Sequence, residues 1–290
     1  MATTRFAPSP TGQLHLGHGY SALVAHDQAR LTGGSYLLRI DDLDASRVRD
    51  VYRSGIDDDL AWLGIVPDAP PLVQSQRLPA YAEFLSRLKG AGLAYPCFCT
   101  RSEITAQIAA SVAAPHGPDG PVYPGTCRGI AASVAVMRIS SGEPHCWRLD
   151  MTEALARVGG PLKWRDVIKG VVVADPAPFG DIVLARRDAP AAYHLASTID
   201  DAYQGITLVV RGADLFAATH VHRLLQALLE LPTPAYHHHA LIAGPDGRRL
   251  AKRDDAASIA SLRQGGTDPV ELIEALRSGQ LPLGYGWLNA

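Results

Sequence analysis

The sequence of 290 residues contains few cysteines, few lysines and no long apolar run. Its four cysteines are too few for a disulfide scaffold. No stretch of about 18 uncharged apolar residues occurs, which excludes an ordinary transmembrane helix, and we expect no membrane partner. The first residues lack the apolar core and cleavage site of a secretory signal, so we expect a cytoplasmic protein.

An excess of charge of one sign is also absent. The 27 Lys and Arg residues against 29 Asp and Glu residues give a formal net charge of −2. That balance excludes a generally basic nucleic-acid coat, so any nucleic-acid contact must be local. Hydrophobic residues make up 47% of the chain and charged residues 19%, which predicts a globular protein with one large domain or two modest ones.

The N-terminal part has the pattern of a βαβ unit. A strand over Thr4–Ala7 and a Pro-rich turn precede a predicted helix over Gly17–Leu31 and a second strand over Tyr36–Ile40. Parallel strands joined in this way predict an α/β sheet covered by helices. Further helices are expected at 51–63, 77–92, 190–203 and 216–230, strands at 206–211 and 237–243, and two short closing helices at 256–263 and 268–278.

The region 93–190 departs from this pattern and is predicted to be an insertion. A Gly- and Pro-rich stretch runs from Pro115 to Gly129. Around it lie short β-like runs near 134–139, 146–149 and 168–174.

The insertion also contains a candidate zinc site, formed by Cys97, Cys99 and Cys127. Thiolates bind Zn²⁺ well, and a structural site has four tetrahedral ligands. His116 and Cys146 are therefore candidates for the missing ligand, and unliganded buried cysteines are the alternative.

The segment from Arg5 to His18 carries the clearest chemistry. A strand ends, a Pro-rich turn reverses the chain, and a helix begins within His15-Leu16-Gly17-His18. Backbone N–H groups and the positive end of the helix dipole favour a phosphate at such a place. Gly17 permits close approach, and His15 and His18 can donate hydrogen bonds to a phosphoryl group that gains charge. The alternative is a helix start with two surface histidines.

Three other polar runs carry less information. Successive residues of a strand point to opposite faces, so His237-His238-His239 cannot converge on one metal ion. Asp57-Asp58-Asp59 is interpreted as a solvated helix face. Asp200-Asp201 lies at the mouth of the resumed α/β half and has no assigned role.

Together these motifs resemble the class I aminoacyl-tRNA synthetases, specifically the glutamyl branch. The family's first signature stands here as His15-Leu16-Gly17-His18, and Leu38-Arg39-Ile40-Asp41-Asp42-Leu43-Asp44 is similar to its Leu-Arg-Ile-Glu-Asp-Thr-Asp. The similarity continues through 198–207 and 210–215. It implies a Rossmann-type α/β catalytic domain with a zinc-binding insertion and a short helical C-terminal tail. The implied segments are 1–92 and 191–245 for the two catalytic halves, 93–190 for an acceptor and zinc-binding insertion, and 246–290 for a lysine-signature loop and stem-contact tail.

The second class I signature is a lysine loop, here Arg249-Leu250-Ala251-Lys252-Arg253. The family form is Lys-x-Ser-Lys-x, so Arg249 and Ala251 depart from it while Lys252 is retained. The resemblance implies that Lys252 acts on ATP phosphates with His15 and His18, that Gly17 also contacts ATP, and that Mg²⁺ accompanies ATP.

The resemblance also implies a glutamate site and a complete zinc ligand set. Cations are needed for the carboxylates of glutamate and an anion for its amino group. Asp41 stands where most relatives have Glu; it is one methylene shorter, so its contact with the ammonium group is expected to be rearranged or bridged by water. The glutamate residues carried over are Arg5, Phe6, Ala7, Pro8, Ser9, Asp41, Tyr193 and Arg211, and the ligands of one structural zinc are Cys97, Cys99, Tyr123 and Cys127.

The tail after Asp254 has room for a couple of helices, whereas a full glutamyl-tRNA synthetase carries a sizeable helical region that reads the anticodon. Together with the Cys-x-Cys and Tyr-x3-Cys pattern, this resembles the truncated branch that attaches glutamate to the queuosine base in the anticodon of tRNA(Asp). The implied partners are ATP, L-glutamate and the anticodon stem-loop of tRNA(Asp), bound by a monomer.

Two other functions remain open at this point. One is a minimal synthetase that charges the 3′ end of tRNA(Glu). The other is a catalytically silent, synthetase-like binding or regulatory protein, which the departures at Asp41, Arg249 and Ala251 favour. The retained His15, His18, Lys252, Arg5 and Arg211 weigh against it.

Overall fold

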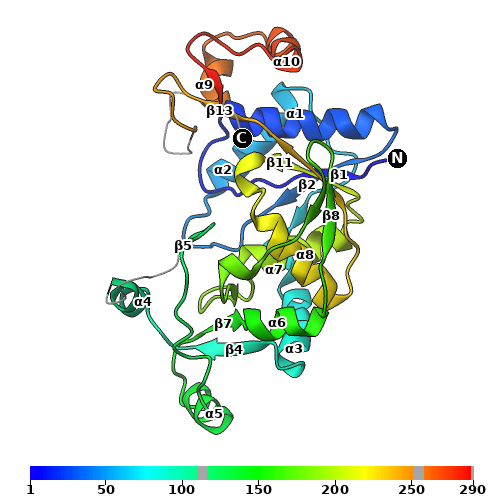
Figure 1. Ribbon diagram of the computed structural model, residues 1–290. Helices are drawn as coiled ribbons and strands as arrows, with labels where there is room; N and C mark the ends of the chain where they lie inside the picture. Colours follow the sequence, from blue (N-terminus) through cyan, green and yellow to red (C-terminus); the bar gives the residue numbers. More distant parts are fainter. Residues whose placement is uncertain (110–115, 251–257, 289–290) are drawn as a thin grey trace.

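The computed structural model describes residues 1–109, 116–250 and 258–288. In Figure 1 helices α9 and α10 lie at the top of the view, with α1 just below them, the central sheet lies in the middle, and helix α5 lies at the bottom. The elements of the first half are β1 (Thr4–Phe6), α1 (Leu16–Leu31), β2 (Tyr36–Ile40), α2 (Asp50–Trp62), β3 (Leu72–Val73), η1 (Gln74–Arg77) and α3 (Leu78–Gly90).

The segment that follows contains mostly short elements. They are β4 (Ala94–Cys97), α4 (Arg101–Ala109), β5 (His116–Gly117), β6 (Gly120–Pro121), α5 (Ala132–Ser140), β7 (Cys146–Leu149), α6 (Met151–Val158), β8 (Lys163–Asp166), β9 (Gly170–Val173), η2 (Ala177–Phe179) and β10 (Val183–Ala185). The last part contributes α7 (Tyr193–Tyr203), β11 (Leu208–Gly212), η3 (Ala213–Leu215), α8 (Ala218–Leu229), β12 (Ala235–His239), β13 (Leu241–Ala243), α9 (Ile259–Gln264), α10 (Pro269–Arg277) and β14 (Gly286–Leu288).

The central sheet is mainly parallel, as the βαβ pattern predicts. Strand β1 pairs in parallel with β2, and β2 with β3. A second group has the order β11-β12-β8-β9, in which only β9 runs antiparallel to its neighbour. The two groups meet at β1 and β11, where the N–H of Leu208 donates to the carbonyl of Thr3 at 3.1 Å. This is the mixed α/β architecture expected of the catalytic domain.

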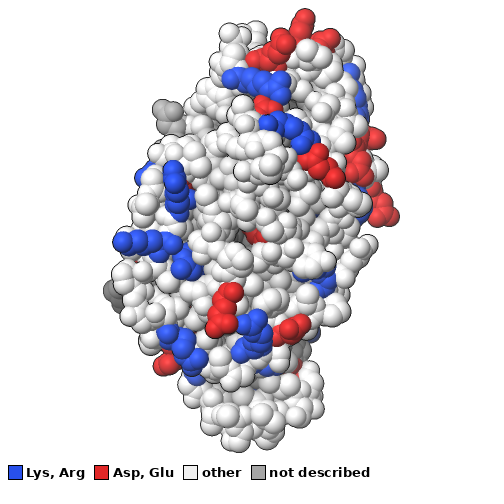
Figure 2. All heavy atoms as spheres, turned by 90° about the vertical axis from the view of Figure 1, so that its right-hand side faces the viewer, with Lys and Arg blue, Asp and Glu red and all other residues white. Residues whose placement is uncertain are grey.

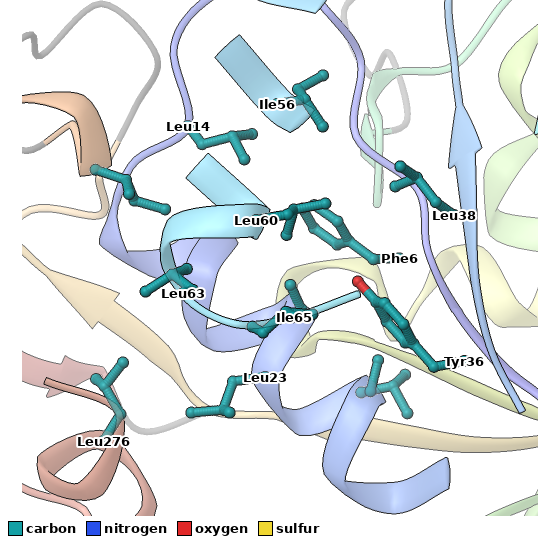
Figure 3. Packing of buried hydrophobic residues seen from close by; sticks show 14 of the residues in the cluster. Phe6, Leu14, Leu23, Tyr36, Leu38, Ile56, Leu60, Leu63, Ile65 and Leu276 are labelled. Atoms are coloured by element: carbon teal, nitrogen blue, oxygen red, sulfur yellow. The ribbon is translucent and has the colours of Figure 1, made fainter. Parts of the chain in front are cut away.

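One apolar core joins the start of the chain to its end. Figure 3 shows Phe6 from β1 and Leu38 from β2 packed with Leu23 of α1 and Leu60 of α2. Leu276 of α10 belongs to the same cluster, so the C-terminal helix α10 packs with β1, β2, α1 and α2 in one core.

A glycine allows this close packing between α1 and the C-terminal helices. A Cβ at Gly19 would lie 3.0 Å from Cδ1 of Ile259, the first residue of α9. Ile259 is itself buried in the core.

The predicted insertion contributes strands to three sheets, of which the smallest is the two-stranded hairpin of β5 and β6. Strands β4, β7 and β10 form an antiparallel sheet, and a second core lies between this sheet and helices α3, α6, α7 and α8. Strands β8 and β9, in contrast, extend the central sheet beside β12. The segment 93–190 thus pairs and packs with elements from both the earlier and the later part of the chain.

The interpretation of Asp57-Asp58-Asp59 as a solvated helix face was wrong for Asp59, which is 2% exposed because α2 turns it to the same buried side as Ile56 and Leu60.

Two expectations about single elements were also wrong. The β-like run at 134–139 is helix α5, in which Ala135 is buried and Ile139, four residues later, packs against the cysteine cluster while Val136 is exposed. The run at 237–243 is two strands, since the chain leaves β12 and pairs β13 with β14.

The described surface agrees with the balanced composition. The face shown in Figure 2 carries both signs of charge, scattered among uncharged residues. No helix of the described residues is long and apolar enough to cross a membrane.

Candidate active site

A cavity of about 540 Å³ opens where β1, β2, β11 and β12 end and α1 begins. The carboxyl ends of parallel strands are the usual place for a ligand in such sheets, and this volume suits a small-molecule ligand. The structure brings together here every described residue predicted for glutamate or ATP: Arg5, Phe6, Ala7, Pro8, Ser9, His15, Gly17, His18, Asp41, Tyr193 and Arg211.

The two signature histidines lie at the N-terminus of α1. Their rings are stacked with centroids 3.6 Å apart, and the backbone N–H of His15 donates to Nδ1 of His18 at 3.2 Å. A neutral His18 therefore carries its proton on Nε2, where it is a donor. A Cβ at Gly17 would lie 3.1 Å from the His15 ring, so glycine is what lets that ring lie against the first turn.

The structure describes the residues on the two sides of the lysine loop. Lys252 and Ala251 lie outside the described residues. On one side of them, Leu250 lines the cavity. On the other side, Ser258 forms a bridge with His15, and the N–H of Ile259 donates to the carbonyl of Leu14 at 2.8 Å. The described residues on the two sides of the loop thus lie at the cavity or against His15, which also lines it.

Arg249, the residue that replaces the first signature lysine, has a partner of its own. Its guanidinium lies 2.8 Å from a carboxylate oxygen of Asp214, and both residues line the cavity.

A buried ion cluster underlies the glutamate side of the cavity. Asp201 of α7 accepts from Nε of Arg5 at 2.8 Å, and Nη1 of Arg39 donates to the same oxygen at 2.5 Å. Burial alone would raise the pKa of Asp201, but Arg5 and Arg39 outweigh it and hold that pKa below its usual range. Arg39 also donates to Asp41 at 2.7 Å and so sets the direction of that carboxylate. Arg39 and Asp201 were not among the predicted site residues, although both lie inside the motifs that carried the resemblance.

The side chain of Asp200, the neighbour of Asp201, binds a different set of residues. Its carboxylate is fully buried and accepts from Gln74, Arg77 and Tyr81 at 2.7–2.8 Å. It therefore ties α7 to η1 and α3 behind the site.

Arg211 of β11 is held by neutral side chains. It donates from Nε to Nε2 of His238 at 3.2 Å and from Nη2 to Thr219 at 2.6 Å. From Nη1 it donates to Tyr193 at 3.2 Å and to His222 at 3.3 Å. Burial and the Arg211 charge lower the pKa of His238 to about 4, which keeps its ring neutral and able to accept.

His238 also explains the three-histidine run. Its Nδ1 donates to Asp166 of β8 at 2.7 Å, while Nε2 accepts from Arg211. The interpretation of the run as a strand is confirmed, and strand alternation could have indicated that His238 points inward. The partners of His238 lie far away in the chain, so the sequence held no signal for its role.

The cysteine cluster lies outside the cavity. The sulfurs of Cys97, Cys99 and Cys127 all lie within 4.8 Å of one another. The hydroxyl of Tyr123 lies 3.3 Å from Sγ of Cys97 and 3.6 Å from Sγ of Cys99. Three thiolates are ligands that fit Zn²⁺, and the phenol oxygen of Tyr123 lies beside them at the place of a fourth ligand.

Cys146 and His116 are the alternatives to Tyr123 as the fourth zinc ligand. Cys146 pairs with Cys97 across β4 and β7, but its sulfur does not belong to the group of three. The side chain of His116 lies outside the described part of the structure.

Comparison with known proteins identifies the protein family. Residues 1–282 match the family model "tRNA synthetases class I (E and Q), catalytic domain", where E and Q denote glutamate and glutamine. The chain belongs to this family.

The most similar relatives include two that share a more particular name. The "Glutamyl-Q tRNA(Asp) synthetase" of Rhodobacter capsulatus is 46% identical over 281 residues, which cover 93% of this chain and 97% of the relative. The protein of the same name from Symbiobacterium thermophilum is 39% identical over 283 residues, covering 94% of this chain and 84% of the relative.

Solved structures of glutamate–tRNA ligases share the fold. The enzyme of Elizabethkingia meningosepticum, in complex with its amino acid, is 29% identical with a TM-score of 0.73 over 87% of this chain. The glutamate–tRNA synthetase of Elizabethkingia anophelis is also 29% identical, with a TM-score of 0.74 over 87% of this chain. The chain spans about half of each of these longer proteins, 52% and 53%.

Proposed function

We propose that the protein activates L-glutamate with ATP and transfers it to the queuosine base in the anticodon of tRNA(Asp). One observation carries the proposal: the cavity joins His15, His18, Asp41 and Arg211 in a chain that spans 97% of a relative with this named activity. We further propose a cytoplasmic monomer and the four segments 1–92, 93–190, 191–245 and 246–290, the last of which contacts the RNA stem.

In the first step a glutamate carboxylate oxygen attacks the α-phosphorus of ATP and pyrophosphate leaves. The donor on His18 and the N-terminal end of α1 face the place where phosphate charge develops. Arg211 and Tyr193 bind a carboxylate, and Asp41, held by Arg39, binds the amino group. Mg²⁺, when bound with ATP, neutralises phosphate charge. Lys252 acts on the same phosphates.

In the second step a hydroxyl of the queuosine cyclopentenediol attacks the activated carbonyl, and AMP leaves. The protein's part is to hold the two reactants in line, since positioning alone supplies a large share of such rate enhancements. The buried carboxylate of Asp201 holds Arg5 and Arg39, which line the cavity, through hydrogen bonds and so supports that positioning.

Outside the cavity, we propose one structural zinc held by Cys97, Cys99, Cys127 and Tyr123. The ion supplies no reaction step; it ties β4 and the segment around residue 127 together.

The test is transfer of labelled glutamate, with ATP and Mg²⁺, to queuosine-containing tRNA(Asp), to the same tRNA without queuosine, and to tRNA(Glu). A ribonuclease digest then locates the label. Label in the anticodon loop of queuosine-containing tRNA(Asp) alone is the expected result. Label at the 3′ end of tRNA(Glu) instead identifies a minimal charging synthetase. No label and no adenylate identifies a silent binding protein.

A further inference from the structure

Arg211 is reached by a chain of side chains that begins at the protein surface. Nη1 of Arg211 lies 3.3 Å from Nδ1 of His222, and Nε2 of His222 lies 3.2 Å from Nδ1 of His194. Nε2 of His194 lies 3.2 Å from Oδ2 of Asp119, in the turn between β5 and β6. The four residues come from β11, α8, α7 and the β5–β6 turn.

The direction of every hydrogen bond in this chain follows from Arg211. A guanidinium only donates, so Nδ1 of His222 must accept and its proton must be on Nε2. His222 then donates to Nδ1 of His194, and His194 carries its own proton on Nε2 and donates it to Asp119. His222 is 2% exposed, and burial together with the Arg211 charge holds its pKa well below the usual value, in keeping with a neutral ring.

The outer end of the chain is held in place by close packing. A Cβ at Gly117 of β5 would lie 2.3 Å from the carbonyl oxygen of Pro178 in η2, so the hairpin backbone rests directly on that turn. The side chain of Asp119 is nevertheless 63% exposed, whereas that of His194 is 12% exposed. A surface hairpin is thereby connected to the cavity through two rings.

The same bonds determine what Arg211 offers to a ligand. His222 and Tyr193 occupy Nη1, Thr219 occupies one N–H of Nη2, and His238 occupies Nε. Among the described residues no hydrogen bond uses the second N–H of Nη2. Tyr193 accepts from Arg211, so its own hydroxyl proton is available as a donor. Two donors side by side, from Arg211 and Tyr193, match the two oxygens of a carboxylate.

We propose that Asp119, His194 and His222 are positioning residues that hold Arg211 in the orientation that binds the glutamate carboxylate. The inference rests on the proposed function in taking glutamate as the ligand. The β5–β6 hairpin thereby contributes to amino-acid affinity although it does not line the cavity.

The central test compares His222→Gln with His222→Leu. A glutamine can accept from Arg211 through Oε1 and donate to His194 through Nε2, whereas leucine can do neither. His222→Leu is expected to raise the KM for glutamate about 10- to 100-fold, the effect of losing a hydrogen bond to a charged group, with the KM for ATP unchanged. His222→Gln is expected to stay within about threefold of wild type, since a neutral acceptor is kept.

Asp119→Ala and Asp119→Asn test the outer end without disturbing the core, because that side chain is exposed. Asparagine still accepts from His194 and is expected to resemble wild type; alanine is expected to raise the KM for glutamate a few-fold. His220→Gln is the matched control: His220 lies on α8 two residues before His222 but accepts from the backbone N–H of Asp175 at 3.0 Å and does not reach Arg211.

Calorimetric binding of glutamate, measured without tRNA, separates this inference from the proposed function. Weaker glutamate binding by His222→Leu and Asp119→Ala, with near-normal binding by His222→Gln and Asp119→Asn, supports the proposal that this chain of side chains positions Arg211. Equal effects on glutamate and ATP, or a lower melting temperature with unchanged glutamate affinity, would falsify it. Wild-type protein that binds no glutamate overturns both ideas. Wild-type protein that binds glutamate but does not label tRNA(Asp) overturns the proposed function alone.

Discussion

Arg5 and Asp201 form a buried bidentate ion pair. Nε of Arg5 lies 2.8 Å from Oδ1 of Asp201, and Nη2 lies 3.2 Å from Oδ2. Both side chains are buried, and they join β1, near the start of the chain, to α7, which lies 196 residues later in the sequence. The pair therefore fixes how the two halves of the cavity face one another.

Replacing Asp201 by Ala is expected to lower the free energy of unfolding by about 3–5 kcal/mol, because Arg5 and Arg39 would remain buried without their counter-ion. Urea denaturation measures the change. Asp188→Ala is the control, since that side chain is 66% exposed and pairs with Arg186; its effect is expected to stay within about 0.5 kcal/mol. If both substitutions changed the free energy of unfolding by a similar, small amount, the Asp201 cluster would not stabilise the fold.

Asp166→Asn is expected to weaken glutamate binding while the protein stays folded. Oδ1 of Asp166 accepts from the N–H groups of Ile168 and Lys169, so the new amide group must face His238. That donor forces the His238 proton from Nδ1 to Nε2, against the N–H of Arg211.

A rise of about 10-fold or more in the KM for glutamate, with little change in kcat, is the expected outcome for Asp166→Asn. Steady-state kinetics at fixed ATP gives both values. Asp166→Glu keeps an acceptor and should retain more affinity than Asp166→Asn. An unchanged KM in Asp166→Asn would exclude His238 as a partner that orients Arg211.

The cysteine cluster predicts one tightly bound zinc per chain. Cys97→Ser, Cys99→Ser and Cys127→Ser are each expected to lose the metal, whereas Cys146→Ser keeps it because its sulfur is not in the group of three. Elemental analysis of the purified proteins measures the zinc content. Loss of zinc in Cys146→Ser, with retention in Tyr123→Phe, would instead make Cys146 the fourth ligand.

Asp59 is expected to destabilise the fold near neutral pH. Burial raises its pKa to about 6, although Arg263 opposes the shift, whereas the unfolded value is about 3.9. A carboxyl with a raised folded pKa favours folding in its protonated form, so its ionisation lowers stability as the pH rises from about 4 through 6.

Asp59→Asn removes that ionisation and is expected to be more stable than wild type by about 2 kcal/mol at pH 7.5, with no gain near pH 4. Urea denaturation at several pH values gives the difference between the two proteins. Asp58→Asn, with the neighbouring exposed carboxyl, is the matched control. A gain that does not depend on pH would contradict a titration at Asp59.

Lys252→Ala is expected to slow activation of glutamate by a factor corresponding to about 2–4 kcal/mol, as for the loss of other charge-stabilising groups. Adenylate formation with ATP, Mg²⁺ and glutamate measures it. Lys169→Ala serves as control, because Lys169 lies over the ring of Phe216 and does not line the cavity. Near-normal adenylate formation in Lys252→Ala would remove Lys252 from the site.

Local patterns were enough to predict much of the fold. The turn after Phe6 and the helix start at His15 depend on neighbouring residues, as does the β2 strand after the glycines at 33 and 34, and these elements form where expected. The break between β12 and β13 was missed because only pairing with β14, far along the chain, ends the first strand. The helix α5 was missed because its valines favour strands, and the packing of Ile139 on the cysteine cluster overrides that preference.

The sequence by itself determined the family and the helix start at His15, because each depends on motifs of neighbouring residues, and it showed the three thiols as a candidate metal site. Only the tertiary structure decided which groups orient those motifs. Asp201 meets Arg39 from 162 residues away, and His222 meets His194 from 28 residues away. A hydrogen bond requires specific atoms at about 3 Å, and that distance is set by how distant elements pack rather than by any local pattern.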